Sequence, residues 1–262
     1  MIHTLIQILV FQLLFLAVYD FLLKKETFFN WNRVYLILTP ILSVVLPFIS
    51  IGLIQQNIPQ EFYVQMPAVI LGETASKTGS TSLLWFMSLK NLWTIGMIVS
   101  TLIFCYKIFK IIKLKRSGTT KYVDGNRLTM LPKTDTAFSF LTTIYLGENI
   151  SEEKKENIIA HEKIHLQQKH SLDLLYFELL RIVFWFNPLV YVFQNKISTL
   201  HEYIADAEIS RRTNKKDYYQ NLLSEVFQTQ EISFVNTFFK QSLIKKRIVM
   251  LKKSKSPKNR ML

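Results

Sequence analysis

Three long apolar segments constrain the fold of this chain more than any other feature. Residues 5–23, 34–54 and 92–112 hold few charged side chains and come close to or exceed the roughly 20 residues that a helix needs to cross a bilayer. The first segment lacks the basic start and the small-residue cleavage site of a signal peptide, so we expect it to be retained. Prolines 40 and 47 are tolerated as kinks in a membrane helix. The pattern predicts a mainly α membrane protein with three spans.

Basic residues predict which side of the membrane each loop faces. The chain carries 32 Lys and Arg against 19 Asp and Glu, although 49% of its residues are hydrophobic. Lys and Arg gather in the cytoplasmic loops of membrane proteins. They lie between the first two spans and directly after the third, whereas residues 55–82 hold only Lys77. We therefore expect residues 55–82 outside, and the first loop and everything after residue 112 in the cytoplasm. Because the basic residues adjoin apolar runs, we expect no direct nucleic-acid binding.

A His-Glu-x-x-His motif lies at His161, Glu162 and His165. Residues four apart share one face of a helix, so the two imidazoles can bind one metal ion. Glu162 then lies beside the coordination position that stays open for water, where a general base is needed. Ser151, followed by two glutamates, is a suitable helix start, and no Gly or Pro interrupts residues 151–186. The motif is typical of zinc metallopeptidases.

Such a zinc site needs a third protein ligand. The candidates are His170, His201 and Glu202, with Asp173 and Asp206 behind them. His170 follows His165 by five residues, which rotates it off the ligand face of a helix, so we expect it at the surface or behind a ligand. Glu202 and Asp206 share a helix face, so one carboxylate can bind zinc while the other orients a histidine ring. An ordinary charged helix face has the same spacing.

The apolar run 172–193 is compatible with two topologies. Its length fits a fourth span, but it contains three charged residues and the pair Asn187-Pro188. The segment from Lys240 to Leu262 carries nine Lys or Arg and no acid, which indicates that it stays on the cytoplasmic side. We therefore expect an apolar helical hairpin, buried or dipping into the membrane, that bends at Asn187-Pro188.

Short strands are expected between the third span and the zinc motif. Residues 121–123 and 128–131 flank Asp124-Gly125, which predicts a hairpin, and residues 137–146 predict a further strand. An edge strand near the metal can pair with an extended substrate backbone. The candidate substrate-binding residues are Phe138, Ser139 and Phe140. A strand that only packs against the zinc helix is an equally weighted alternative.

Several motifs, in this order, resemble those of the regulatory membrane zinc metallopeptidases of the BlaR/MecR antibiotic-sensor type. They are residues 137–140 (Ala-Phe-Ser-Phe), 160–165, 169–173 (Lys-His-Ser-Leu-Asp), 185–188 (Trp-Phe-Asn-Pro) and 202–206. The resemblance implies a transmembrane region at 1–112, a cytoplasmic α+β zinc domain of the gluzincin type with a small sheet at 113–239, and a basic tail at 240–262. It implies Zn²⁺ as the cofactor, bound by His161, His165 and Glu202, with Glu162 as the base and Asp206 supporting a ligand from behind.

The resemblance also implies a regulatory role in a multi-pass protein of a bacterial-type cytoplasmic membrane. The expected partners are membrane lipid and a protein or peptide substrate, such as a transcriptional repressor or the chain itself. Those sensors commonly continue into a further span and an external ligand-binding domain, so we expect either a truncated chain or a separate sensor protein. The alternatives are a non-catalytic signalling or adaptor protein, against which Glu162 argues, and a housekeeping zinc protease, whose intramembrane chamber three spans do not readily form.

Overall fold

The computed structural model describes residues 2–49, 89–123, 125–212, 218, 234–254 and 256–257. The predicted external loop, 55–82, and the end of the second predicted span, 50–54, lie outside this part of the chain. Three of the described helices are long and apolar enough to cross a membrane. These stretches are His3–Leu23, Phe29–Phe48 and Lys90–Ser117.

The bounds of these helices differ from the predicted ones at their polar ends. They are α1 (Ile2–Val18, continued by a π-helical turn at Tyr19–Leu23), α2 (Phe29–Val45, continued by a 3-10 turn at Leu46–Phe48) and α5 (Leu89–Ser117). Helix α2 begins five residues before the predicted start at Val34, because its polar first turns have partners within the protein. Asn32 donates to the carbonyl of Leu23 at 3.0 Å, and Arg33 binds Asp173. Polar residues with such partners can continue an apolar helix.

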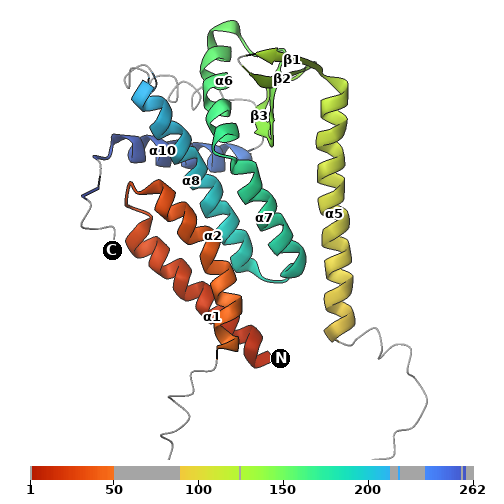
Figure 1. Cartoon of the computed structure of the whole chain (residues 1–262), viewed down its shortest axis with the longest axis vertical. Coiled ribbons are helices and arrows are strands. Elements are labelled where there is room, and N and C mark those ends of the chain that lie inside the picture. Colours follow the sequence, from red (N-terminus) through yellow and green to blue (C-terminus); the bar gives the residue numbers. More distant parts are fainter. Residues whose placement is uncertain are drawn as a thin grey trace, which may run out of the picture.

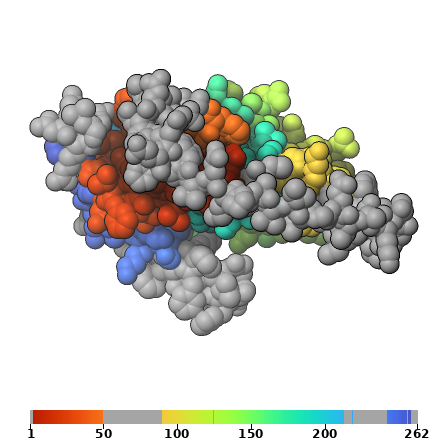
Figure 2. All heavy atoms as spheres, turned by 90° about the horizontal axis from the view of Figure 1, so that it is seen from below, coloured from red at the N-terminus to blue at the C-terminus, as the bar shows by residue number. Residues whose placement is uncertain are grey.

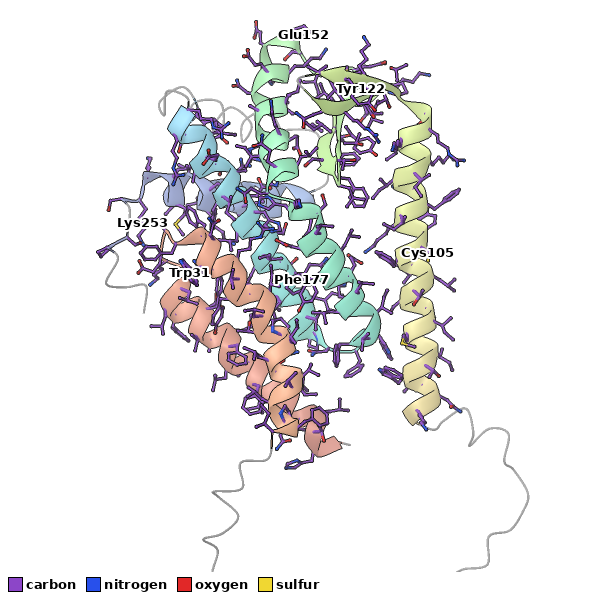
Figure 3. All side chains as sticks on the ribbon, in the orientation of Figure 1. Trp31, Cys105, Tyr122, Glu152, Phe177 and Lys253 are labelled. Atoms are coloured by element: carbon purple, nitrogen blue, oxygen red, sulfur yellow. The ribbon has the colours of Figure 1, made fainter. Side chains whose placement is uncertain are left out.

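Helices α7 (His170–Val183) and α8 (Pro188–Arg212) form a hairpin that packs against α1 and α2 (Figure 1). Asn187 caps α8 by accepting a hydrogen bond from the Leu189 amide at 2.9 Å, and Pro188 occupies the first helical position. The Asn187 amide also donates to Gln12 of α1 at 2.7 Å, with both side chains buried. The buried apolar core of this layer comprises Leu16, Tyr19, Leu36, Phe177, Val190, Phe193, Ile197 and Leu200, and Figure 3 labels Phe177 on α7.

Helix α5 lies at one side of this layer and α1 toward the other, as both views show (Figures 1 and 2). Its link to α7 includes Lys107, whose ammonium is 3.1 Å from the Glu178 carboxylate. Gly96 lies against Trp185, where a Cβ atom would be 2.0 Å from the indole ring. The apolar surface of α5 is otherwise exposed, as expected for a helix that faces lipid.

A four-stranded sheet follows α5 directly. Its strands are β1 (Thr119–Val123), β2 (Asn126–Leu131), β3 (Ala137–Phe140) and β4 (Thr143–Gly147), in the order β1-β2-β4-β3. Strands β2 and β4 are parallel, and the other two pairs are antiparallel. Gly125 closes the β1–β2 hairpin with a φ of 75°, a conformation that glycine adopts without strain.

The prediction of one strand over residues 137–146 is wrong, because the chain reverses at Leu141. Leu141 has a φ of 50°, and its amide donates to the Ser171 hydroxyl at 3.1 Å. This contact with α7 stabilises a turn for which the local sequence has no Gly, Asn or Pro. The reversal leaves β3 at the edge of the sheet.

Helix α6 (Glu152–Gln167) joins the sheet to the helical layer. Ile158, Ile159 and Leu166 of α6 pack on the strands, and Figure 3 labels Glu152 at the first residue of the helix. Helix α10 (Phe234–Lys252) crosses α8 on the other side of the molecule from α5. The predicted boundary at residues 239 and 240 therefore lies inside one helix.

Candidate metal centre

Three side chains converge where α6 and α8 lie side by side. The Nε2 atoms of His161 and His165 are 3.0 Å apart. Glu202 of α8 completes the group, with one oxygen 3.3 Å from His161 Nε2 and the other 3.6 Å from His165 Nε2. The structure thus brings together the two histidines of the motif and the carboxylate predicted as their partner. All three side chains are largely but not fully buried.

The spacing of these atoms fits a tetrahedral zinc ion. Zinc lies about 2.0–2.2 Å from imidazole nitrogen and carboxylate oxygen, so neighbouring ligand atoms in a tetrahedron are about 3.3–3.5 Å apart. The two histidine nitrogens are 3.0 Å apart, and the nearer Glu202 oxygen to each lies at 3.3 and 3.6 Å, while one ligand atom from each residue lies within 4.8 Å of the other two. Two imidazoles and one carboxylate form a donor set typical of catalytic zinc, with the fourth position left for water. The residues present therefore fit this metal.

The protonation states of this cluster also favour metal binding. Burial lowers the pKa of His165 to about 4, and the neighbouring His161 contributes in the same direction. Burial alone would raise the pKa of Glu202, but the hydrogen bond and charge of His161 lower it to about 2. The same pairing raises the pKa of His161 above its ordinary value, although burial opposes this. Near neutral pH the site offers a carboxylate and a neutral imidazole, the forms that metals bind.

Glu162 lies next to this cluster and faces strand β3. Burial raises the pKa of its carboxyl group, while the charge of His161 and hydrogen bonds from the hydroxyl and backbone of Ser139 partly offset that rise. A carboxylate whose pKa is moved toward neutrality is suited to accept and return protons. Ser139 therefore touches the candidate base, whereas Phe138 stacks on Tyr145 of β4 with ring centroids 4.7 Å apart.

A small cavity of about 70 Å³ opens beside the metal ligands. It is lined by Ser139, His165, His170, Ser171, Leu174, Ser198, His201 and Glu202. Its wall includes the edge strand β3, so the strand predicted to align a substrate does border the site. The roles of Phe138, Ser139 and Phe140 in binding a substrate stay a prediction.

Asp206 lies behind His161, fully buried, with one oxygen 3.9 Å from His161 Nδ1. It accepts hydrogen bonds from Tyr218 at 2.7 Å and from Arg247 at 2.8 and 2.5 Å. Arg247 also reaches Glu202 at 3.2 Å, so one guanidinium bridges both carboxylates. Burial alone would lower the pKa of Arg247, but its bonds to Asp206 raise it above its ordinary value.

Arg247 was missed by the sequence reasoning because it lies in the predicted basic tail, among six other cations of residues 240–255 that gave it no distinguishing mark. The two carboxylates predicted for one helix face, Glu202 and Asp206, could have indicated that a cation lies beside them. Two carboxylates that turn one helix face into a buried site require a cation from another part of the chain.

His170 and His201, the other candidate ligands, lie outside the three-ligand group. Of the two positions expected for His170, the one behind a ligand is found and the one at the surface is wrong, since the side chain is 2% exposed. Helix α6 ends at Gln167, and Lys169 adopts a left-handed conformation with a φ of 55°. The chain then starts α7 at His170, and the His170 ring returns to within 2.7 Å of His165, Nδ1 to Nδ1. His201 is also buried and pairs with Asp173, Nε2 to Oδ2, at 2.7 Å.

Comparisons with known proteins found similarity over the region that holds this site. Residues 140–251 match the peptidase family described as BlaR1 peptidase M56. The chain is also 27% identical over 114 residues to "Regulatory protein BlaR1" of Staphylococcus aureus. That match covers 41% of this chain and 20% of the relative, so the chain spans only about a fifth of that protein's length. The chain thus resembles the BlaR/MecR-type M56 family, and with its three apolar helices it is a membrane-associated, metallopeptidase-like protein.

Proposed function

We propose that this chain, with its resemblance to the M56 peptidases, is a membrane zinc metallopeptidase that hydrolyses peptide bonds. The observation that carries the proposal is the joint placement of three side chains, whose ligand atoms lie within 4.8 Å of one another, and a buried glutamate beside them. A purely structural zinc site is closed by four protein ligands and has no use for a base. Here only three protein ligands are found among the described residues, which leaves a coordination position for water, and Glu162 supplies the base.

His161, His165 and Glu202 would hold the zinc ion. When bound, zinc supplies Lewis acidity that lowers the pKa of a water ligand and polarises a carbonyl group. Glu162 accepts a proton from the attacking water at its carboxylate and returns it to the leaving amine. Ser139 holds that carboxylate in place from β3 through its hydroxyl and backbone. The free edge of β3 offers main-chain hydrogen bonds to an extended substrate backbone.

The charge pattern of the loops supports a site on the cytoplasmic side of a multi-pass membrane protein. Resemblance to a regulatory protein supports a role in signalling, with a transcriptional repressor or the chain itself as substrate. A separate sensor protein is a candidate partner in that role.

The test compares wild type with Glu162→Gln, both purified in detergent. Zinc content is measured on the purified proteins, and cleavage is followed by intact-mass analysis of the chain itself and by digestion of fluorescently labelled β-casein. We expect about one zinc per chain in both proteins, and a cleavage rate 10²–10⁴-fold lower in the variant, the usual contribution of a general base.

Two further variants separate the metal site from the base. Glu202→Ala removes a ligand and should lose zinc and cleavage together, whereas Glu208→Ala changes a partly exposed glutamate six residues along α8 and should change neither. Absence of zinc from the wild type under metal-replete conditions overturns the proposal. Equal cleavage by wild type and Glu162→Gln overturns the role of Glu162.

A further inference from the structure

We propose that Arg33, on membrane helix α2, is a positioning residue for the metal ligand His165. It acts through three side chains that lie in sequence between them: Asp173, His201 and His170. This inference rests on the proposed metal site and extends it, because it connects that site to a membrane helix far from it in the chain.

The first contact of this route is between the two histidines, His165 and His170. Their Nδ1 atoms are 2.7 Å apart, so one must donate and the other accept. A metal bound at His165 Nε2 leaves the proton of that ring on Nδ1, which makes His165 the donor and His170 the acceptor. Burial holds the pKa of His170 well below its ordinary value, which agrees with an uncharged, accepting ring. His170 therefore fixes the tautomer and the rotation of a metal ligand.

The second contact orients His170 itself. Its Nε2 atom is buried and makes no hydrogen bond within the described part of the structure. The ring instead stacks on His201, with centroids 3.9 Å apart and planes 9° from parallel. Because His170 Nε2 has no hydrogen bond there to hold the ring, displacement of the stacked His201 would let His170 rotate away from His165.

The third contact fixes His201 through a carboxylate that also binds Arg33. His201 Nε2 lies 2.7 Å from Asp173, and Arg33 binds the two oxygens of the same carboxylate at 2.7 and 3.1 Å. Burial would raise the pKa of Asp173, but the hydrogen bonds from His201 and Arg33 lower it below its ordinary value. Asp173 is therefore ionised, and the guanidinium provides the bidentate geometry that a planar fork gives.

Arg33 has a second attachment that leads to the same helix. Its guanidinium donates to the carbonyl of Gln168, at the C-terminal cap of the helix that carries His161 and His165. A cation at this end also compensates the partial negative charge of the helix terminus. Arg33 thus holds both the end of α6 and the side chain that supports His165 from behind. A shift of α2 in the membrane would act on the metal ligand through both.

The test measures metal binding as well as cleavage in the full chain in detergent. Zinc affinity is determined by competition with a chromophoric chelator, and the visible spectrum of the Co²⁺-loaded protein reports ligand geometry. For Arg33→Met we expect a 10–100-fold loss of zinc affinity, the usual cost of removing outer support from a ligand, and altered Co²⁺ bands. We expect kcat to fall with little change in KM. The zinc affinity of Arg33→Lys should lie between those of wild type and Arg33→Met, because an ammonium group cannot bind both carboxylate oxygens in parallel.

Lys196→Met is the matched control. The Lys196 ammonium, 17% exposed against 18% for Arg33, binds Asp20 at 2.6 Å and also links a membrane helix to the bundle. Among the contacts of the described residues, Lys196 touches no member of the route to His165, so the zinc affinity and Co²⁺ spectrum of Lys196→Met should match those of wild type.

A double variant tests whether Arg33 acts through the route. His170→Ala alone should weaken zinc binding, and adding Arg33→Met should weaken it by less than the product of the two single effects. Wild-type zinc affinity and Co²⁺ bands in Arg33→Met overturn the inference, as do multiplicative effects in the double variant. A wild type that binds zinc but cleaves nothing would sink the proposed peptidase activity and leave this route to be judged on metal binding alone.

Discussion

Removal of Arg247 should destabilise the metal-free protein by about 3–5 kcal/mol, the usual cost of breaking a buried ion pair from one side. Arg247 is 8% exposed, and its partner Asp206 is completely buried. In Arg247→Met the hydrophobic stem is retained, but the Asp206 carboxylate keeps only the Tyr218 hydroxyl as a hydrogen-bond donor among the contacts described. Each of the two bonds lost from Arg247 to Asp206 is charge-assisted and contributes about 1.5–3 kcal/mol, so their sum of about 3–6 kcal/mol overlaps that range.

The assay is thermal unfolding in detergent with a chelator present, followed by tryptophan fluorescence. For a chain of this size 1 kcal/mol corresponds to about 2–4 °C in Tm, so Arg247→Met should unfold roughly 10 °C below wild type. Arg212→Met removes a guanidinium with a similar 2.7 Å contact to Glu208. There, however, the Arg212 side chain is 63% exposed, and the side chain of Arg211, which also contacts Glu208, is 64% exposed. We expect this exposed pair to cost at most about 0.5 kcal/mol.

Adding Asp206→Asn to Arg247→Met should recover at least about 2 kcal/mol, because the buried charge that Arg247 leaves behind is then removed. Equal Tm values for Arg247→Met and Arg212→Met would refute the reasoning. A double variant less stable than Arg247→Met alone would show that the uncompensated carboxylate is not the source of the loss.

Three further predictions use the same purified protein. Burial lowers the pKa of His170 and keeps the ring neutral in the folded protein, whereas the unfolded chain protonates it below about pH 6.5. Stability therefore decreases as the pH is lowered below that value. Between about pH 6 and 5, the free energy of unfolding of chelator-treated His170→Gln, measured by denaturant melts, should depend on pH less steeply than that of wild type, by about 1.4 kcal/mol per pH unit. Equal slopes for the two proteins would contradict this. Ser139→Ala removes a hydroxyl that lowers the pKa of Glu162, so the acidic limb of the kcat/KM profile should move to higher pH, not stay in place. Asn187→Ala removes a helix cap and leaves Gln12 without that partner, and a denaturant melt should show about 2–4 kcal/mol lost, where less than 1 kcal/mol refutes the capping role.

Local periodicity was enough to predict the features that depend on neighbours along one element. The two motif histidines share a face of α6 because four residues make about one helical turn. The apolar segments gave three helices, and the second begins earlier than predicted where its polar residues have partners, as Arg33 has in Asp173. Glu202 was proposed from its pairing with the motif helix and from a family resemblance, since its spacing alone is common on charged helices.

Long-range contacts determined the features that sequence could not predict. The left-handed residue at Lys169 ends α6, and the turn at Leu141 divides a predicted strand, but neither site has the Gly or Asn that usually permits a positive φ. Both turns are held by contacts with other elements, including the Ser171 hydroxyl on the Leu141 amide. Arg247 became part of the metal site only because α10 crosses α8, a placement that no local pattern encodes.

The placement of Arg247 on α10 has a consequence for the order in which the metal site can assemble during translation. Arg247 is 86 residues beyond His161 in the chain. At about 5–20 residues per second, a ribosome needs roughly 4 to 17 seconds to add them. Glu202 and Asp206 are made partway through that interval, and until Arg247 follows they lack the cation that binds both of them. The ion pairs that connect α8 to α10 can therefore form only after the last described helix has been made.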